Sequence, residues 1–506
     1  MTKAQFQSLF VEEPLLTFGE GKSYIDPKMG LLAYGPCMFK TRRVISSSIR
    51  LGIIGTRETI NLAQHWINRC HGEIQGKTND AKLFPPFPGF TRIFGSELRI
   101  LSECVEVLNE DDVDRAIEST NFQKRVRSVA KLILSKLSNF RTREPKPQVV
   151  IIALPQKIVD RCGTPREDYI RTRIGPSKSE KEILKIIRQH RRTGQTELIP
   201  FDEDTLEMVP EMSDLRRIIK AEAMVYDLPT QLAKPTTFMT DSEESSTQDE
   251  ATRAWNFCVA LYYKAEGYPW KLADMPIGTC YVGVTFYKVP TSEGGYTRAS
   301  LAQIFTHTGE GLVLKGGRAI IDQRTRTPHL SKETAFQLMK DALELYRNQM
   351  NATPIRLVVH KSSRYWSEEI SGFRQAASGI ENIDFITIQT RGIRFMRSRG
   401  IYPPIRGTVI QIAKDSYILF TKGWIPFHET YAGLRVPTPI EIVEHCGPSP
   451  IDVVCKEILA LTKMNWNSAD FCIREPITLA YAREVGKILA YLPEEVNPRP
   501  EYRFYM

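Results

Sequence analysis

The sequence of 506 residues predicts an α/β protein with two parts, and two observations support this fold class. In the first half, strongly apolar segments alternate with amphipathic segments, which is typical of a parallel sheet covered by helices on both faces. In the second half, three short strands follow one another before helices and strands alternate. We therefore expect two different sheets.

Two apolar segments in the first half are predicted to be buried strands. RLGIIGT (50–56) precedes a predicted helix at 57–70, and PQVVIIALP (147–155) follows a predicted helix at 122–140. Such near-continuous apolar runs are typical of strands buried on both faces. The alternation with helices predicts a Rossmann-like domain.

A basic pair lies on the next predicted helix. The stretch DLRRIIKAEAMVYDLPTQ (214–231) reads as an amphipathic helix, a turn and the start of a strand. Arg216 and Lys220 are four residues apart, so they share one face of the helix. Downstream, residues 253–265 form a predicted helix that is apolar almost all round and must be buried on most sides, with Lys264 at its end. Thr247 and Glu250 match a capping box that would open this helix.

The second half has a different order of elements. Predicted strands at 279–289, 298–307 and 311–316 are joined by turns that contain glycine, as in a meander. A long helix, a strand, a second helix and a further strand follow, and two helices close the chain. Three hairpin strands followed by alternating helix and strand is the order of an RNase H-like fold.

Composition sets bounds on function. The chain carries 68 Lys and Arg against 59 Asp and Glu, a net charge of +9, which is compatible with nucleic acid without proving it. Nine cysteines without a C-x-x-C pair indicate a reducing compartment and no zinc site. Neither a signal peptide nor a membrane-spanning run is predicted, so we expect a cytoplasmic protein.

Six segments occur in one order along the chain: LPTQ (228–231), ALYYKAEGYPWKL (260–272), YVGVTFYK (281–288), RLVVHKSSRYW (356–366), LTKMNWN (461–467) and PITLAYAREVG (476–486). This ordered set resembles the MID and PIWI domains of the Argonaute proteins. The absence of room for separate N and PAZ domains makes the chain similar to the short prokaryotic Argonautes. The resemblance implies a MID-containing part at 1–270 and a PIWI domain at 271–506.

The resemblance implies a site for the 5′-phosphate of a guide strand, formed by Arg216, Lys220, Gln231 and Lys264. A terminal phosphate carries close to two negative charges, which Arg and Lys can neutralise while Gln donates a neutral hydrogen bond. The family often has Tyr or His at the position of Arg216. The alternative is a solvated basic face, with Lys264 only complementing the helix dipole.

The chain ends in NPRPEYRFYM, with aromatic residues up to the last position. In the family, the terminal carboxylate helps to bind a divalent cation beside the guide phosphate. Carried over, this is the carboxylate of Met506, and the cation is expected to be Mg²⁺ because the ligands are hard oxygens. The alternative is that Phe504 and Tyr505 merely pack the tail onto the core.

Cleaving members of the family hold two metal ions with a set of acidic residues in the PIWI domain. Here Thr285 stands at the first acidic position and Lys361 at the third. Glu310 reads as a turn residue, and Asp470 lies near the last position. We therefore expect a protein that binds a guide–target duplex without cutting it. Four arginines in TRGIRFMRSRG (390–400) are candidates for contacts with the phosphate backbone: Arg391, Arg394, Arg397 and Arg399.

The resemblance implies a guide RNA, a single-stranded DNA target and a partner subunit with an APAZ region. That subunit would carry a TIR or sirtuin-like NADase, less often a nuclease, which is activated in defence against plasmids or phage, with a higher oligomer forming on activation. Two alternatives stay open. One is a divergent metal-dependent nuclease, and the other is a basic nucleic-acid-binding protein that uses no guide.

Overall fold

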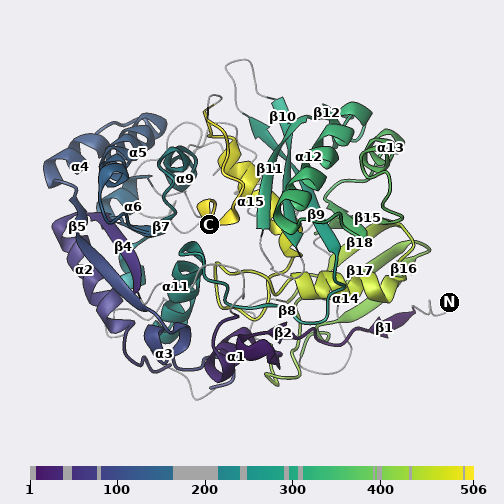
Figure 1. The fold of residues 1–506 in the computed structure, drawn as a ribbon, viewed down its shortest axis with the longest axis horizontal. Coiled ribbons are helices and arrows are strands. Elements are labelled where there is room, and N and C mark those ends of the chain that lie inside the picture. Colours follow the sequence, from purple (N-terminus) through teal and green to yellow (C-terminus); the bar gives the residue numbers. More distant parts are fainter. Residues whose placement is uncertain are drawn as a thin grey trace, which may run out of the picture.

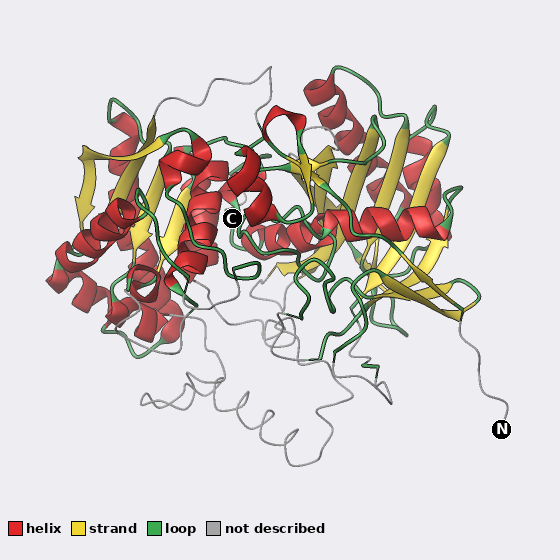
Figure 2. Cartoon of the chain, turned by 90° about the horizontal axis from the view of Figure 1, so that it is seen from below, coloured by secondary structure: helices red, strands yellow, loops and turns green. Residues whose placement is uncertain are grey.

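The structure is a computed structural model that describes residues 7–37, 48–76, 81–162, 215–239, 248–289, 296–305, 311–390, 394–395, 402–431, 436–493 and 496–506. Two groups of strands lie on opposite sides of the molecule, with helices packed against them (Figure 1, Figure 2). The C-terminus lies between the two groups, so the final residues sit where the two halves meet. Within the described segments, no helix is both long and apolar enough to cross a membrane.

The first group is a four-stranded sheet in which every pairing is parallel. Strand β4 lies between β5 and β6, and β7 follows at the edge, which gives the order β5-β4-β6-β7. This order and the helical connections confirm the Rossmann-like arrangement. The strands are β4 (Ser48–Gly55), β5 (Glu97–Val107), β6 (Val149–Ala153) and β7 (Thr230–Ala233).

Helices cover both faces of this sheet, because neighbouring residues of its strands face two separate cores. Ile53 and Ile151 belong to one core, whereas Ile54 and Ile152 belong to the other. This double burial explains the apolar runs in the sequence. The helices of this half are α2 (Arg57–Arg69), α3 (Phe90–Phe94), α4 (Glu110–Ile117), α5 (Phe122–Ser138), α6 (Gln156–Cys162), α9 (Leu215–Ala223), α10 (Pro235–Phe238) and α11 (Glu250–Lys264).

Helix α11 is buried at every residue except Asn256, as its apolar sequence predicts. The capping prediction for this helix was wrong. Asp249 is the N-cap, and its carboxylate accepts a hydrogen bond from the backbone N–H of Thr252 at 3.1 Å. An Asp directly before the first turn satisfies the free N–H groups as well as the predicted Thr247 would, and Thr247 itself lies outside the described residues.

The second group is a nine-stranded sheet with the order β1-β16-β17-β18-β15-β14-β9-β10-β11. Its strands β9, β10 and β11 form an antiparallel meander, and β14 and β15 then run parallel to β9. This topology confirms the RNase H-like fold. The strands are β1 (Ser8–Phe10), β9 (Thr279–Val289), β10 (Tyr296–Phe305), β11 (Gly311–Arg318), β14 (Arg356–Lys361), β15 (Asn382–Gln389), β16 (Thr408–Ala413), β17 (Ser416–Leu419) and β18 (Ile440–Cys446).

Strand β9 again divides two cores. Val282 and Val284 pack with α12 (Lys332–Met350) and α13 (Ser367–Ala376) on one face. Tyr281 packs on the other face with α14 (Ile451–Leu461) and α15 (Ile477–Leu489). Helix α15 approaches β9 so closely that a Cβ atom at Gly283 would lie 2.2 Å from the carbonyl oxygen of Thr478. The glycine therefore permits the contact between helix and sheet.

The N-terminal segment crosses between the halves. Strand β1 pairs with β16 of the nine-stranded sheet. Beyond it, the buried Arg406 bonds Glu13 at 2.7 Å, and Lys463 bonds the same carboxylate at 3.0 Å. The domain boundary at residue 270 stays a prediction. Strand β1 precedes this boundary in the sequence but pairs with the sheet of the second half. The remaining elements are α1 (Pro27–Tyr34), β2 (Leu16–Thr17), β3 (Ser23–Tyr24), β8 (Lys271–Leu272), β12 (Ile320–Ile321), β13 (Pro328–His329) and the 3₁₀ turns η1 (Gly19–Gly21), η2 (Asn139–Thr142), η5 (Met224–Tyr226) and η6 (Tyr502–Phe504).

Candidate functional site

Three elements of the first half bring the predicted phosphate-binding residues together. Helix α9 carries Arg216 and Lys220, strand β7 carries Gln231, and α11 ends at Lys264. The Nζ of Lys264 donates to Oε1 of Gln231. The Nζ of Lys220 donates to the backbone carbonyl of Thr230, the residue before that Gln. The two ammonium groups therefore bond to adjacent residues of one strand.

Both lysines are buried, each with only 1% of its surface exposed. No carboxylate of the described residues pairs with either of them. Burial lowers the pKa of Lys264 to about 7, and the positive charge of Arg216 adds to this shift. Burial likewise lowers the pKa of Lys220 far below its ordinary value, with Lys264 and Arg216 contributing. Two buried cations without a counter-charge are costly, so the cluster suits a strongly anionic ligand.

Arg216 lies at the rim of this cluster and contacts the second half. Its guanidinium donates to the backbone carbonyl of Tyr505 at 3.2 Å and lies 3.8 Å from the carboxylate of Glu484 on α15. Arg216, Glu484 and Met506 line one cavity of about 350 Å³. The basic cluster, the C-terminus and α15 therefore meet at the junction of the two halves.

The C-terminal residues pack against the core at this junction. Tyr502 stacks on Tyr481 with ring centroids 3.3 Å apart, and the hydroxyl of Tyr505 donates to the carbonyl of Arg499 at 2.7 Å. Met506 is buried. The tail is therefore packed onto the core, and the same packing brings the terminal residue to the cavity beside Arg216.

A magnesium ion would need oxygen ligands at this junction. Met506 supplies a terminal carboxylate, while Glu475 and Glu484, which line the same cavity, are already paired with Arg483 and Lys487 respectively. Among the residues that the structure describes, no cluster of three His, Cys, Asp or Glu side chains could hold a metal ion. The residues fit Mg²⁺ only if phosphate oxygens complete the ligand set.

The two positions expected to carry catalytic acids lie side by side in the nine-stranded sheet. Lys361 at the end of β14 pairs in register with Val284, the residue before Thr285 on β9. Thr285 is buried, and its hydroxyl has no hydrogen-bond partner in the described parts of the chain. Lys361 is fully buried and bonds the carboxylate of Glu369 at 2.8 Å.

Glu369 is a residue that the sequence interpretation missed. Its carboxylate accepts hydrogen bonds from the backbone N–H groups of Leu330 and Trp366, both at 2.8 Å, and lies 3.4 Å from Nδ1 of His329. These contacts and Lys361 occupy both of its oxygens. The signal available in the sequence was the acidic pair after Trp366, which is typical of a helix start.

The other predicted residues are not gathered at one place. Asp470 is exposed, and its carboxylate accepts a hydrogen bond from the hydroxyl of Ser468 at 3.0 Å. Its neighbour Ala469 donates to Asn256 of α11 at 2.9 Å, so this segment lies against the first half. Arg394 is exposed. The remaining predictions in this group lie outside the described residues: Glu310, Arg391, Arg397 and Arg399.

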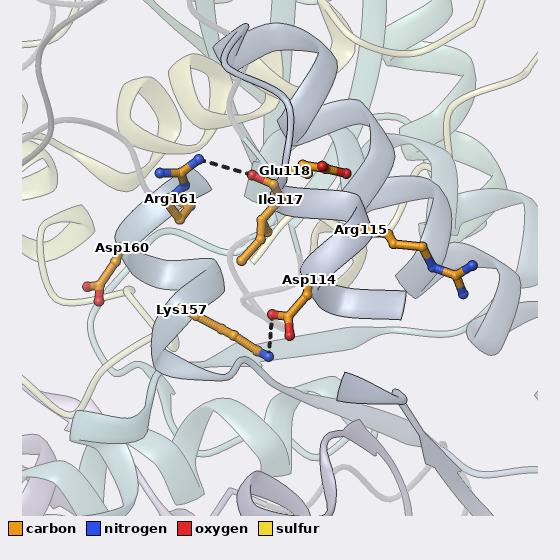
Figure 3. A pocket seen from close by; sticks show the side chains of 7 residues that line it. All are labelled: Asp114, Arg115, Ile117, Glu118, Lys157, Asp160 and Arg161. Carbon is orange, nitrogen blue, oxygen red and sulfur yellow. Dashed lines mark hydrogen bonds and ion pairs between the residues drawn. The ribbon is translucent and has the colours of Figure 1, made fainter. Parts of the chain in front are cut away.

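A second cavity of about 720 Å³ opens between α4 and α6 (Figure 3). Two of its basic side chains already have partners: Lys157 bonds Asp114 at 2.6 Å, and Arg161 donates to the carbonyl of Ile117 at 3.2 Å. Three acidic and three basic side chains line it: Asp114, Glu118, Asp160, Arg115, Lys157 and Arg161. This balance gives the cavity no preference for an anion, in contrast to the lysine cluster.

Comparison with known proteins gives one relative by sequence. The protein argonaute of Aquifex aeolicus is 21% identical over 256 residues, which is 50% of this chain and 33% of that protein. No protein-family model matches the sequence. The chain thus spans about a third of the length of this relative.

Solved structures match nearly the whole chain. Clostridium butyricum Argonaute, bound to a guide DNA and a 19-mer target DNA, matches 97% of this chain and 54% of its own with a TM-score of 0.61 at 17% identity. A. aeolicus Argonaute matches 98% of this chain and 54% of its own, with a TM-score of 0.55 at 16% identity. Drosophila Piwi matches 99% of this chain and 56% of its own, with a TM-score of 0.57 at 11% identity. Together with the two sheets described above, these likenesses show that the chain has an Argonaute fold, with a Rossmann-like MID half and an RNase H-like PIWI half.

Proposed function

We propose that this chain binds the 5′-phosphate of a guide strand with Arg216, Lys220, Gln231 and Lys264. The observation that carries the proposal is the pair of buried lysines for which the described segments supply no carboxylate partner. A terminal phosphate supplies the missing negative charge and several acceptor oxygens. Its arrival would favour the protonated form of Lys264 and allow the amide of Gln231 to donate to a phosphate oxygen.

Arg216 would add a planar, permanently charged donor at the rim of the site. This guanidinium lies 3.8 Å from the carboxylate of Glu484, so phosphate would compete with that carboxylate. The carboxylate of Met506, together with phosphate oxygens, would hold Mg²⁺, whose charge would offset the repulsion between the two anions. The chain's own contribution is to hold that carboxylate at the junction by the packing of Tyr502 and Tyr505.

We further propose that the chain does not cleave nucleic acid. Two-metal hydrolysis needs anionic ligands at adjacent strand ends. The side chains of Thr285 and Lys361 cannot take that role, and both oxygens of the nearby Glu369 carboxylate already accept hydrogen bonds. The competing hypothesis is a divergent nuclease that uses Asp470. Cleavage of a paired target in Mn²⁺, lost in Asp470→Asn, would establish that alternative and contradict this one.

The guide is proposed to be RNA and the target single-stranded DNA, with base pairing supplying the sequence specificity. A partner subunit with an APAZ region and a TIR or sirtuin-like NADase would provide the enzymatic activity, in defence against plasmids or phage. These proposals rest on the resemblance to short prokaryotic Argonautes and on the absence of acids at positions 285 and 361.

Nucleic acid that co-purifies with the chain tests the proposal. We expect short RNAs of narrow length distribution that accept a 5′-label only after phosphatase treatment, because the bound end already carries phosphate. The Lys220→Met, Lys264→Met double variant should lose them, and Lys131→Met on the exposed face of α5 should retain them. Strands of mixed length that are indifferent to phosphatase would support the guide-independent alternative.

A further inference from the structure

A small hairpin in the second half presents arginines on a rigid turn. Strands β12 and β13 pair through Ile320 and His329, and residues 322–327 connect them. The carboxylate of Asp322 accepts hydrogen bonds from the backbone N–H groups of Arg324 at 2.8 Å and Thr325 at 2.6 Å. Arg326 adopts a φ of 58°, which a side chain other than glycine rarely takes and which the surrounding bonds must maintain.

The hairpin gathers positive charge. Arg318, Arg324 and Arg326 are exposed, and none of them pairs with a carboxylate in the described parts of the chain. The guanidinium of Arg318 lies over the ring of Tyr296, 4.3 Å from its centroid. The only acid of the turn, Asp322, uses its carboxylate to fix the backbone. The hairpin therefore presents Arg324 and Arg326 to solvent, with Arg318 at the end of β11 just before it, against the single acidic side chain of Asp322, which interacts with Arg324.

The hairpin stands at the carboxyl end of the central strands. His329 stacks on Trp366 with ring centroids 4.0 Å apart and contacts Glu369, which bonds Lys361 at the end of β14. In Figure 1, β12 lies at the end of the sheet where α12 begins. Ligands of open α/β sheets bind outside the carboxyl ends of strands, and the N-terminus of a helix favours negative charge.

We propose that this hairpin binds the phosphate backbone of the strand that pairs with the guide. The identity of the strand rests on the proposed function. The cationic side chains suit phosphate, which is contacted without regard to sequence. Two neighbouring isoleucines, Ile320 and Ile321, are 47% and 40% exposed and supply apolar surface for the sugars between phosphates. Exposed isoleucines beside an arginine with a positive φ do not improve solubility, so this surface is better explained as a binding surface.

The test is the binding of a labelled complementary DNA to the full chain preloaded with a 5′-phosphorylated RNA guide, over a range of salt concentrations. The variant is Arg324→Gln, Arg326→Gln, and the matched control is Lys340→Gln, Arg347→Gln on the exposed face of α12. In the hairpin variant, guide affinity should stay within about twofold while the dependence of log K on log salt falls by about 1.8, since each duplex phosphate contact contributes about 0.9. The control variant should match the wild type in guide affinity and in the salt dependence of target binding.

A target affinity and salt slope equal to those of the wild type would overturn the hairpin proposal even if guide binding is normal. Failure of the proposed function would be recognised by a different result: the wild-type chain would bind guides with and without a 5′-phosphate equally well. In that case the same two variants are compared on a preformed RNA–DNA duplex. An unchanged salt slope there overturns the hairpin site, and a reduced slope supports it as a duplex-binding surface.

Discussion

The buried lysines Lys361, Lys220 and Lys264 have different hydrogen-bond partners, which indicates a structural role for the first and a binding role for the other two. Lys361 pairs with the buried carboxylate of Glu369 at 2.8 Å. Among the residues that the structure describes, Lys220 and Lys264 donate to neutral oxygens of strand β7 and to no carboxylate. Spacing in the sequence predicts that Arg216 and Lys220 share a helix face. It does not predict that Lys264, 33 residues after Gln231, reaches the same strand, because that contact depends on the tertiary fold.

The stability of the chain should therefore depend on pH through Lys264. Its pKa in the folded state is about 7, below the ordinary value of 10.5, so between these values the unfolded chain binds more protons. The free energy of unfolding should rise with pH from about 7 to 10. Urea denaturation of the nucleic-acid-free chain at pH 7 and pH 9 measures this. Lys264→Met should be more stable than the wild type at pH 7 and show a smaller rise, and an equal rise would contradict the account.

Lys361→Met should have the opposite effect. It leaves the carboxylate of Glu369 buried without its cation, which costs about 3–5 kcal/mol of unfolding free energy. The double variant Lys361→Met, Glu369→Gln should recover much of the loss, since it removes both charges. Denaturant midpoints of the three variants at pH 7 provide the comparison. A Lys361→Met protein as stable as the wild type would show that the ion pair is not structural.

At the level of the secondary-structure elements, helix α15 connects the basic cluster to the central strands. It carries Glu484 near Arg216 at one position and Thr478 against Gly283 of β9 at another. Most helices and strands could be predicted because their apolar periodicity follows from burial on one or two faces. The pairing of β1 with β16 could not, because a three-residue strand has too little pattern and its partner lies about 400 residues away along the chain.

Glu484→Gln should strengthen binding of a 5′-phosphorylated guide by roughly two- to fivefold. The change removes a carboxylate that holds Arg216, and exposed ion pairs of this kind are worth at most about 1 kcal/mol. Fluorescence anisotropy with a labelled RNA gives the affinity. Glu475→Gln is the matched control, because Glu475 lines the same cavity but pairs with Arg483 instead. Equal or weaker binding by Glu484→Gln would mean that Arg216 does not exchange between carboxylate and phosphate.

At the scale of the molecule, two sheets flank a junction that contains the basic cluster, the C-terminus and α15. The order of segments predicted this two-part fold, because the period of the apolar pattern differs between a doubly covered parallel sheet and a meander. The contacts at the junction join residues far apart in the sequence, such as Arg216 and Tyr505, and no local pattern encodes them. The acidic partner of Arg216 was missed for this reason.

Recognition of the 5′-phosphate is best measured as the ratio of affinities for one RNA with a 5′-phosphate and with a 5′-hydroxyl. We expect a preference for the 5′-phosphate of at least about tenfold, because hydrogen bonds to charged groups contribute about 1.5–3 kcal/mol each. The preference should disappear in Lys220→Met, Lys264→Met and persist in Lys131→Met. Equal affinity of the wild-type chain for the two RNAs would contradict the account and leave the buried lysines without their proposed ligand.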